Sequence, residues 1–159
     1  MKVSARRATS DDLTTLESLY RKLEKEMESL HTMWPLADGL DEPVVDSFRQ
    51  SLDQPDTLIL IGEIDEYPFG FLLARVELLL AQAGGELVGA IRLIYVDEDA
   101  REVALGEKMR EMALDILRQR GITKFDAHVL PGHRLAKNFY EAGGFSARSI
   151  IMHHDDERE

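Results

Sequence analysis

The spacing of apolar residues changes along the chain, and each change marks an expected element. A short apolar and polar run from Val3 to Ala8 predicts a first strand. Between Leu13 and Leu30, apolar residues then recur every three or four positions, which is typical of a helix that buries one face. Thr9 to Asp12 supply a capping side chain and first-turn acids for the start of this helix. The pattern of the N-terminal part therefore predicts a strand followed by an amphipathic helix.

The middle of the chain predicts one short helix and three strands. Residues His31 to Asp41 have no periodicity and indicate a loop, after which Pro43 begins a short helix. Its expected inward residues are Val44, Val45, Phe48 and Leu52. From Thr57 onward, β-rich runs predict the strands Thr57–Ile64, Phe69–Leu80 and Glu86–Val96, with a turn at 65–68 joining the first two as an antiparallel hairpin.

The C-terminal part returns to helical spacing and then alternates. A long apolar stripe predicts a helix from Val103 to Arg120 that ends at Gly121. The remaining elements are expected to be a strand over Ile122–Leu130, a helix over His133–Ala142 and a strand over Phe145–His153. This order predicts an α/β fold of the mixed α+β kind, a mixed sheet flanked by helices in a single domain spanning residues 1–159.

Composition narrows the function classes. The chain has 30 acidic and 19 basic residues, a net charge of −11, which argues against a nucleic-acid partner. The same charge suits a cationic acceptor, although solubility alone explains it and is the more common reason for an acidic surface. Because there is no cysteine, disulfides, thiolate metal sites and a cysteine nucleophile are excluded. No apolar run of membrane-spanning length and no signal peptide is readable, so we expect a cytoplasmic protein without membrane contact.

One strand-to-helix connection has the residues of an anion site. Ala104 and Gly106 lie where the long helix is expected to begin, and small side chains there let an anion approach the unpaired backbone N–H groups. Arg101 adds a positive charge. The three acids at 97–99 oppose an anion, and a plain connection between strand and helix explains the same residues.

A family resemblance decides between these two interpretations. The stretch Arg101-Glu102-Val103-Ala104-Leu105-Gly106 resembles the coenzyme A signature of the GNAT superfamily of N-acetyltransferases, R/Q-x-x-G-x-G/A. Downstream, Phe139-Tyr140-Glu141-Ala142-Gly143-Gly144-Phe145 is similar to the family element F-Y-E-x-x-G-F. The resemblance implies a twisted mixed sheet of about six to seven strands and about four helices, splayed at a bulge, with acetyl-CoA as cosubstrate and no metal.

The resemblance also implies where acetyl-CoA binds. The pantetheine would run between the fourth and fifth strands beside Ile94, Tyr95 and Val96, and the diphosphate would lie on the turn Arg101 to Gly106. His133 and Lys137 would add contacts to the cofactor. Three positions depart from the pattern: Ala104 replaces the first signature glycine, His133 replaces a frequent asparagine, and Arg92 stands where many relatives carry a catalytic glutamate.

The implied reaction is transfer of an acetyl group to a primary amine, on a small molecule or a protein, directly in a ternary complex because there is no cysteine to carry it. Tyr140 would protonate the leaving thiolate, and a backbone N–H near Tyr95 or Val96 would hold the oxyanion. Glu77, Glu63 or a chain of waters would take the amine proton. His31, Trp34 and Asp38 would line the acceptor pocket.

Two questions stay open at the level of sequence. A regulatory or degenerate GNAT module that binds acyl-CoA without turnover is the alternative function, because Ala104 and Arg92 depart from the family pattern. The chain is expected to be a monomer or a homodimer.

Overall fold

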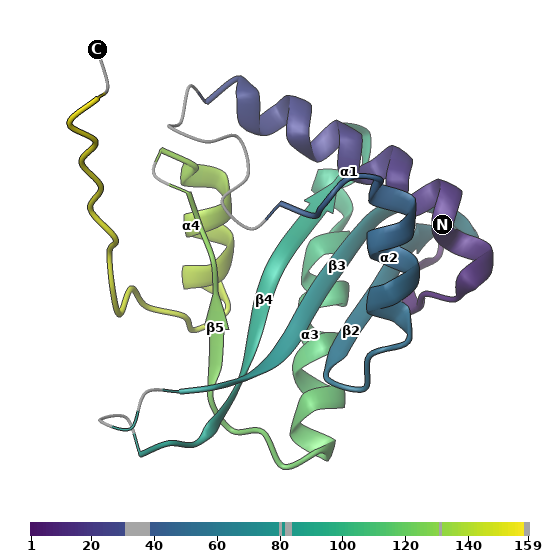
Figure 1. Ribbon diagram of the computed structural model, residues 1–159. Helices are drawn as coiled ribbons and strands as arrows, with labels where there is room; N and C mark the ends of the chain where they lie inside the picture. Colours follow the sequence, from purple (N-terminus) through teal and green to yellow (C-terminus); the bar gives the residue numbers. More distant parts are fainter. Residues whose placement is uncertain (31–38, 80, 82–83, 131, 158–159) are drawn as a thin grey trace.

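One five-stranded sheet forms the centre of the molecule (Figure 1). The computed structural model describes residues 1–30, 39–79, 81, 84–130 and 132–157. In these residues the strands lie in the order β1-β2-β3-β4-β5. Neighbours from β1 to β4 are antiparallel, and β5 runs parallel to β4. The strands are β1 (Val3–Arg7), β2 (Thr57–Ile64), β3 (Tyr67–Leu78), β4 (Leu87–Val96) and β5 (Phe125–Ala127).

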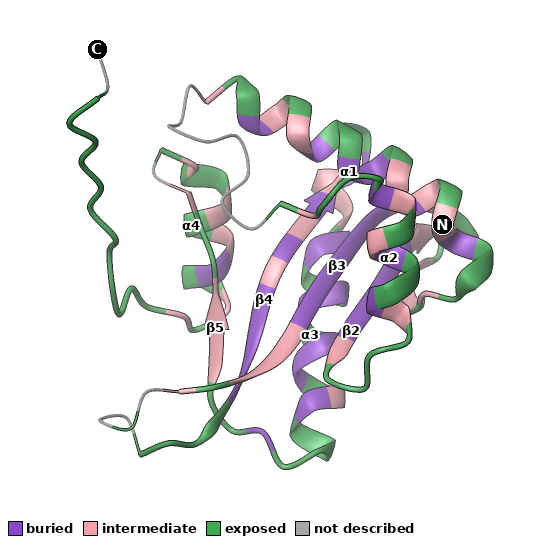
Figure 2. Ribbon diagram, viewed as in Figure 1, coloured by how far each residue is buried: buried purple, intermediate pink, exposed green. Residues whose placement is uncertain are grey.

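Helices cover both faces of the sheet and bury two separate apolar clusters (Figure 2). The helices are α1 (Leu13–Glu28), α2 (Val44–Leu52), α3 (Leu105–Gln119) and α4 (Arg134–Ala142), with 3-10 turns η1 (Ser10–Asp12) and η3 (Glu98–Val103). α1 and α2 pack on one face against Phe71, Leu73, Leu93 and Tyr95. α3 and α4 pack on the other face, where Met109 and Tyr140 meet Leu72 and Ile91. The mixed α/β architecture expected from the sequence is confirmed.

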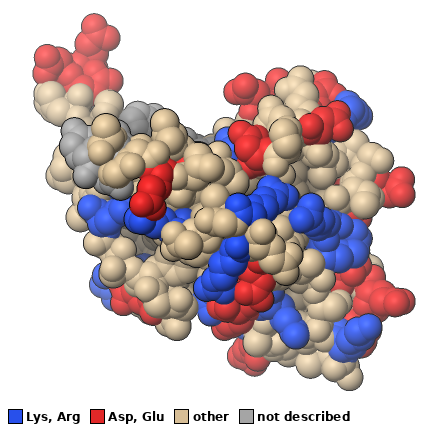
Figure 3. Space-filling model, turned by 90° about the horizontal axis from the view of Figure 1, so that it is seen from below, with Lys and Arg blue, Asp and Glu red and all other residues tan. Residues whose placement is uncertain are grey.

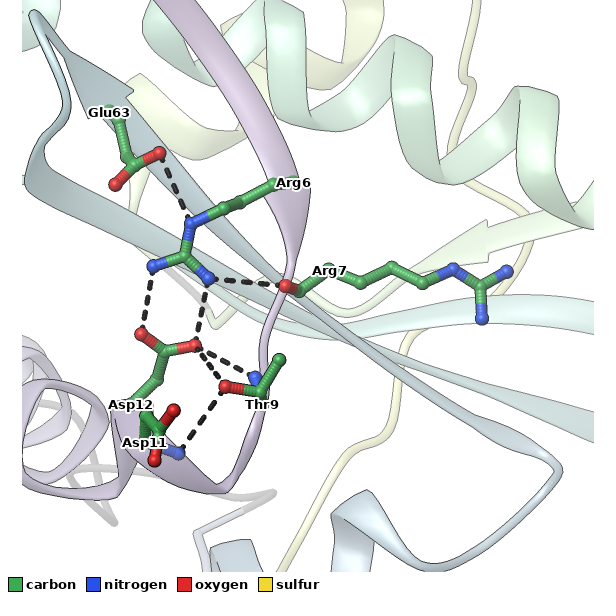
Figure 4. A network of polar contacts seen from close by, with 6 residues as sticks. All are labelled: Arg6, Arg7, Thr9, Asp11, Asp12 and Glu63. Carbon is green, nitrogen blue, oxygen red and sulfur yellow. Dashed lines mark hydrogen bonds and ion pairs between the residues drawn. The ribbon is translucent and has the colours of Figure 1, made fainter.

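Local sequence explains how α1 is joined to the first strand (Figure 4). The Thr9 hydroxyl accepts a hydrogen bond from the Asp11 N–H at 3.3 Å, and the Asp12 carboxylate accepts one from the Thr9 N–H at 2.7 Å. This reciprocal cap satisfies backbone donors that a helix start leaves unpaired. Arg6 of β1 donates two hydrogen bonds of 2.8 Å to Asp12, so β1 and η1 are tied together.

Two glycines let α3 approach the sheet closely. A Cβ atom on Gly62 would lie 2.9 Å from Met109 Sδ. On Gly70 it would lie 2.7 Å from the Tyr95 carbonyl oxygen and 3.0 Å from Met109 Cε. A side chain on Gly70 would therefore collide with the backbone of β4 and crowd Met109 of α3, so glycine is needed there for both elements to lie this close to β3.

The sheet opens where β4 passes β5. Between β3 and β4 the register shifts by one residue: Leu73 faces Leu93 and Ala74 faces Ile91, so Arg92 is the extra residue of a β-bulge. β5 pairs with β4 only from Gly89 to Ile91. Past Ile91, β4 has no strand on that side among the described residues. The bulge that the family resemblance implies therefore lies at Arg92 in β4, before Tyr95 and Val96.

The C-terminal segment departs most from the sequence prediction. Residues 145–153 form no strand, and the strand expected over 122–130 is limited to 125–127. The described sheet thus has five strands instead of six to seven. Ile150, Ile151 and Met152 are 79%, 91% and 88% exposed, because the segment leaves the body of the molecule after Arg148 binds Asp126 (Figure 1). α3 also begins two residues later than expected, at Leu105, because 98–103 form the 3-10 turn η3.

Candidate functional site

Backbone groups of β4 are directed into the opening beside β5. The Asp97 N–H donates to the Phe69 carbonyl at 2.7 Å, so the alternation of an antiparallel pair turns Tyr95 toward β3 and turns Ile94 and Val96 away from it. β5 does not reach these two residues. The carbonyl of Val96 accepts a hydrogen bond of 2.9 Å from Arg101 Nε. Ile94 and the Val96 N–H are thus placed to bond an extended ligand.

The turn after β4 ends in an unusual conformation. Ala104 has φ 64° and ψ 26°, the left-handed region that favours glycine. This conformation ends η3 and begins α3, whose first N–H groups have no partner within the helix. The left-handed backbone therefore explains why the family pattern has glycine at this position. Ala104 adopts the same backbone conformation with some strain.

The residues of the turn from Glu102 to Gly106 differ in how far they are exposed to solvent. Glu102 and Ala104 are exposed, Val103 is half-buried, and Leu105 is fully buried. Gly106 is buried because a Cβ atom there would lie 3.1 Å from Phe139 Cε1 and 3.6 Å from Val96 Cγ2. The lack of a side chain at Gly106 thus lets α3 pack closely against α4 and β4.

Arg101 is held by the protein itself. Its Nη2 donates to Glu26 Oε1 of α1 at 2.6 Å, and its guanidinium lies 5.8 Å from the centre of the Tyr95 ring. His133, at the start of α4, is half-buried, and burial lowers its pKa, with a smaller opposing effect of Glu26. Arg101 and Glu26 therefore connect the turn to α1, and His133 lies close enough to feel the charge of both. Lys137, one turn further along α4, is exposed and lies 3.5 Å from Glu141.

Tyr140 lies in the apolar cluster that borders the opening. It is 4% exposed and packs edge-on against Phe139 and Phe145, with ring centroids 5.1 Å and 5.4 Å away. Ile94 and Val96 belong to the same cluster. Burial raises the pKa of the phenol well above its ordinary value, so Tyr140 stays protonated. Its hydroxyl has no hydrogen-bond partner among the described residues.

A buried arginine that the sequence did not single out supports α4. Arg110 of α3 is 6% exposed, donates a hydrogen bond of 2.7 Å to the Phe139 carbonyl and lies 4.5 Å from the centre of the Phe139 ring. A Cβ atom on Gly143 would lie 2.7 Å from its guanidinium carbon. A charged residue inside the apolar stripe of a helix was the only signal for it in the sequence.

Both glutamates expected as bases are bound to arginines. The two oxygens of Glu77 accept hydrogen bonds of 2.7 Å from Arg92, whose Nη1 also lies 3.1 Å from Nδ1 of His128. Glu63 accepts one of 3.2 Å from Arg6, in the network at the β1 edge of the sheet (Figure 4). The structure thus places Glu77 at the bulge and Glu63 away from the opening, across β3.

The expected acceptor residues His31, Trp34 and Asp38 lie outside the described residues.

Within the described part of the chain, no helix has the length and apolar character needed to cross a membrane. The same part contains no group of three or more histidine and acidic side chains that is arranged to hold a metal ion.

Charge is unevenly spread over the surface. On the face seen in Figure 3, lysine and arginine side chains gather near the middle, and acidic side chains lie mostly around them. The net charge of −11 therefore does not describe every face of the molecule.

Comparison with known proteins identifies the family. Residues 16–145 match the acetyltransferase (GNAT) family over most of the chain. The chain belongs to this family. The site described above is consequently the candidate coenzyme A and acceptor site of a GNAT acetyltransferase, and the family expected from the two sequence motifs is confirmed.

Solved structures agree with this family fold. An aminoglycoside 6'-N-acetyltransferase from Acinetobacter baumannii has a TM-score of 0.75 and 15% identity, with 99% of this chain and 100% of that chain covered. The enzyme AAC(6')-Iy, solved with a bisubstrate analogue of coenzyme A, has a TM-score of 0.79 and 14% identity, with 99% and 100% covered. A protein of Clostridium acetobutylicum described as an acetyltransferase, solved with acetyl-CoA, has a TM-score of 0.75 and 14% identity, with 97% and 96% covered.

One curated protein is similar in sequence over part of its length. It is a mycothiol acetyltransferase from Beutenbergia cavernae, 32% identical over 81 residues, which are 51% of this chain and 26% of that protein. The matched segment thus spans about a quarter of the relative.

Proposed function

We propose that this GNAT member transfers the acetyl group of acetyl-CoA to a primary amine, on a small molecule or a protein, in a ternary complex. The observation that carries the proposal is the opening past Ile91. There the backbone groups of Ile94 and Val96 point away from β3, and their side chains pack in the same cluster as Tyr140. An extended pantetheine chain bonds well to a strand edge with free backbone groups. The start of α3 at Ala104 to Gly106 would receive the diphosphate.

The chemistry follows from the groups at this opening. The neutral amine attacks the thioester carbon, the C–S bond breaks, and the leaving sulfur takes the proton of Tyr140. The nitrogen loses one proton to solvent as it becomes an amide, and solvent returns a proton to the Tyr140 phenolate. Since the pKa of Tyr140 is raised by burial, the phenol holds its proton until the thiolate forms beside it. The same dry surroundings would make that thiolate more basic than it is in water.

The ion pairs of Glu77 and Glu63 argue against either glutamate as the general base that deprotonates the acceptor amine. Both oxygens of Glu77 are engaged by Arg92, and Glu63 is held by Arg6 on the far side of β3. We therefore propose that the amine loses its proton along a path to solvent rather than to either glutamate. The turnover rate should then rise with pH as the fraction of neutral amine increases, since alkyl amines have a pKa near 10.

The absence of cysteine gives a direct assay. Every thiol released in a reaction of this chain with acetyl-CoA comes from the cofactor. Tyr140→Phe should lower kcat by about 100-fold or more, the usual contribution of a positioned acid, while acetyl-CoA binding stays unchanged in titration calorimetry. Tyr67→Phe is the matched control, because Tyr67 is 64% exposed at the start of β3. An unchanged kcat in Tyr140→Phe would remove Tyr140 as the acid.

The same assay separates the enzyme from the alternative function. If acetyl-CoA binds but no amine raises thiol release above hydrolysis, the chain is a degenerate acyl-CoA-binding module.

A further inference from the structure

A polar cavity lies between α2 and β3, on the face of the sheet opposite Tyr140. Its volume is about 220 Å³. Its polar lining includes Asp41, Gln50, Ser51, Gln54 and Arg75. Binding sites for drug-sized molecules occupy about 300–1,000 Å³, so this cavity fits one end of a ligand rather than a whole large one.

Two side chains that line the cavity make no hydrogen bond with the described part of the chain. Arg75 of β3 is half-buried and makes no hydrogen bond or ion pair in the described part of the chain. Ser51 of α2 is only 5% exposed, and its hydroxyl has no partner there either. No buried side-chain nitrogen or oxygen atom in this part of the chain lacks a partner, so the polar atoms of Arg75 and Ser51 are open to the cavity, where a ligand can reach them. A cation and a hydroxyl donor facing one small space favour a ligand with anionic oxygens.

The other polar groups restrict the charge of that ligand. The amides of Gln50 and Gln54 are neutral, whereas Asp41 is an exposed acid on the rim. One arginine opposed by one acid suits a group with a single negative charge. A carboxylate, with two oxygens that match a guanidinium fork, fits better than a phosphate dianion.

The cavity lies at the level where the sheet opens. Arg75 faces Ala90 across the β3–β4 pair, and Ala90 is one residue from Ile91, where the β4–β5 pairing ends. Two residues further along β3, on the same face, Glu77 holds Arg92 of the bulge. A molecule anchored at Arg75 can therefore extend along β3 toward the bulge and the opening.

We propose that this cavity binds a carboxylate of the acceptor, so that the acceptor is a primary amine that also carries a carboxylate, such as an amino acid or a peptide. This inference rests on the proposed acetyl transfer to an amine. A polycationic acceptor would place a positive charge against Arg75, and the cavity offers it only Asp41.

Matched pairs of acceptors test the proposal in the thiol-release assay. Each pair has the same amine with and without a carboxylate: 4-aminobutyrate and butylamine, lysine and cadaverine, and a peptide with a free or amidated C-terminus. The carboxylate member should have a kcat/KM at least about tenfold higher, the effect of one charge-assisted hydrogen-bonded pair. Arg75→Met should bring each ratio close to one, and Arg75→Lys should keep part of it.

Arg49→Met is the control for these variants, because Arg49 is an exposed arginine of α2 that pairs with Asp46 and does not line the cavity. It should leave every ratio unchanged. A wild-type preference for the amines without a carboxylate, or a preference that survives Arg75→Met, would overturn the proposal.

Direct binding keeps this test independent of turnover. If no amine releases thiol, the proposed acetyl transfer fails, and the cavity is then tested by calorimetry with 4-aminobutyrate and butylamine as probes. Binding of 4-aminobutyrate alone, lost in Arg75→Met, upholds the carboxylate site. Equal binding of both probes, or binding of neither, rejects it.

Discussion

Arg110 Nη1 donates a hydrogen bond of 2.7 Å to the carbonyl oxygen of Phe139. The bond joins the middle of α3 to the turn of α4 that carries Tyr140, and the guanidinium also stacks on the Phe139 ring at 4.5 Å. Since Arg110 is buried and Phe139 is half-buried, the position of Tyr140 relative to β4 depends on this contact. Arg110 is a positioning residue in this arrangement and does not touch the reacting atoms.

Removing that contact should lower both stability and turnover. We expect Arg110→Met to reduce the free energy of unfolding by about 2 kcal/mol, because it leaves a carbonyl without its charged donor. A displaced Tyr140 should also lower kcat between about tenfold and 100-fold, with little change in KM for acetyl-CoA. Urea unfolding and the thiol-release assay, run well below the unfolding temperature, measure the two effects separately.

Arg118→Met is the matched control on the same helix. Arg118 is exposed and pairs with Asp115 three residues away, so its loss should cost no more than about 0.5 kcal/mol and leave kcat unchanged. A normal kcat in a destabilised Arg110→Met would show that Arg110 only stabilises the fold.

The left-handed backbone at Ala104 makes a stabilising substitution available. A residue with a Cβ atom pays about 1–2 kcal/mol in this region, whereas glycine pays about 0.5–1 kcal/mol in chain entropy. Ala104→Gly should therefore raise the free energy of unfolding by about 0.5–1 kcal/mol, measured by urea unfolding. Ala142→Gly, within α4, should lower it instead. Destabilisation by Ala104→Gly would contradict the strained turn.

Periodicity was sufficient to predict most helices and strands, because each buries one face against a large partner. α1 and β2 begin within one residue of their predicted starts. The motifs likewise led to the turn at Ala104 and to Tyr140. Contacts between distant residues were not predictable: the Glu77–Arg92 pair depends on the register of β3 and β4, and the position of the bulge depends on one extra residue. Arg110 was missed because its partner is a backbone carbonyl, which has no signature in the sequence.

Stability should depend on pH through His133. Burial lowers its pKa below the ordinary value of 6.5, so the folded chain binds fewer protons than the unfolded chain in the window below 6.5. The free energy of unfolding then rises with pH through that window, and acidification from pH 7 toward 5 destabilises the protein. His133→Gln, which does not titrate, should show a flatter dependence in thermal unfolding. An equal slope in both proteins would exclude His133 as the source.

The structure differs most from the sequence prediction in the exposed C-terminal segment. Residues 145–153 contain β-branched and apolar side chains, which predicted a strand, but Ile151 is 91% exposed and pairs with no strand. Ile151→Asp should therefore change the free energy of unfolding by less than about 0.5 kcal/mol, as is usual for surface sites. Ile59→Asp in β2, where Ile59 is 4% exposed, should cost more than about 4 kcal/mol or prevent folding. A large loss of stability in Ile151→Asp, measured by urea unfolding, would mean that the segment packs against the sheet as the sequence pattern indicates.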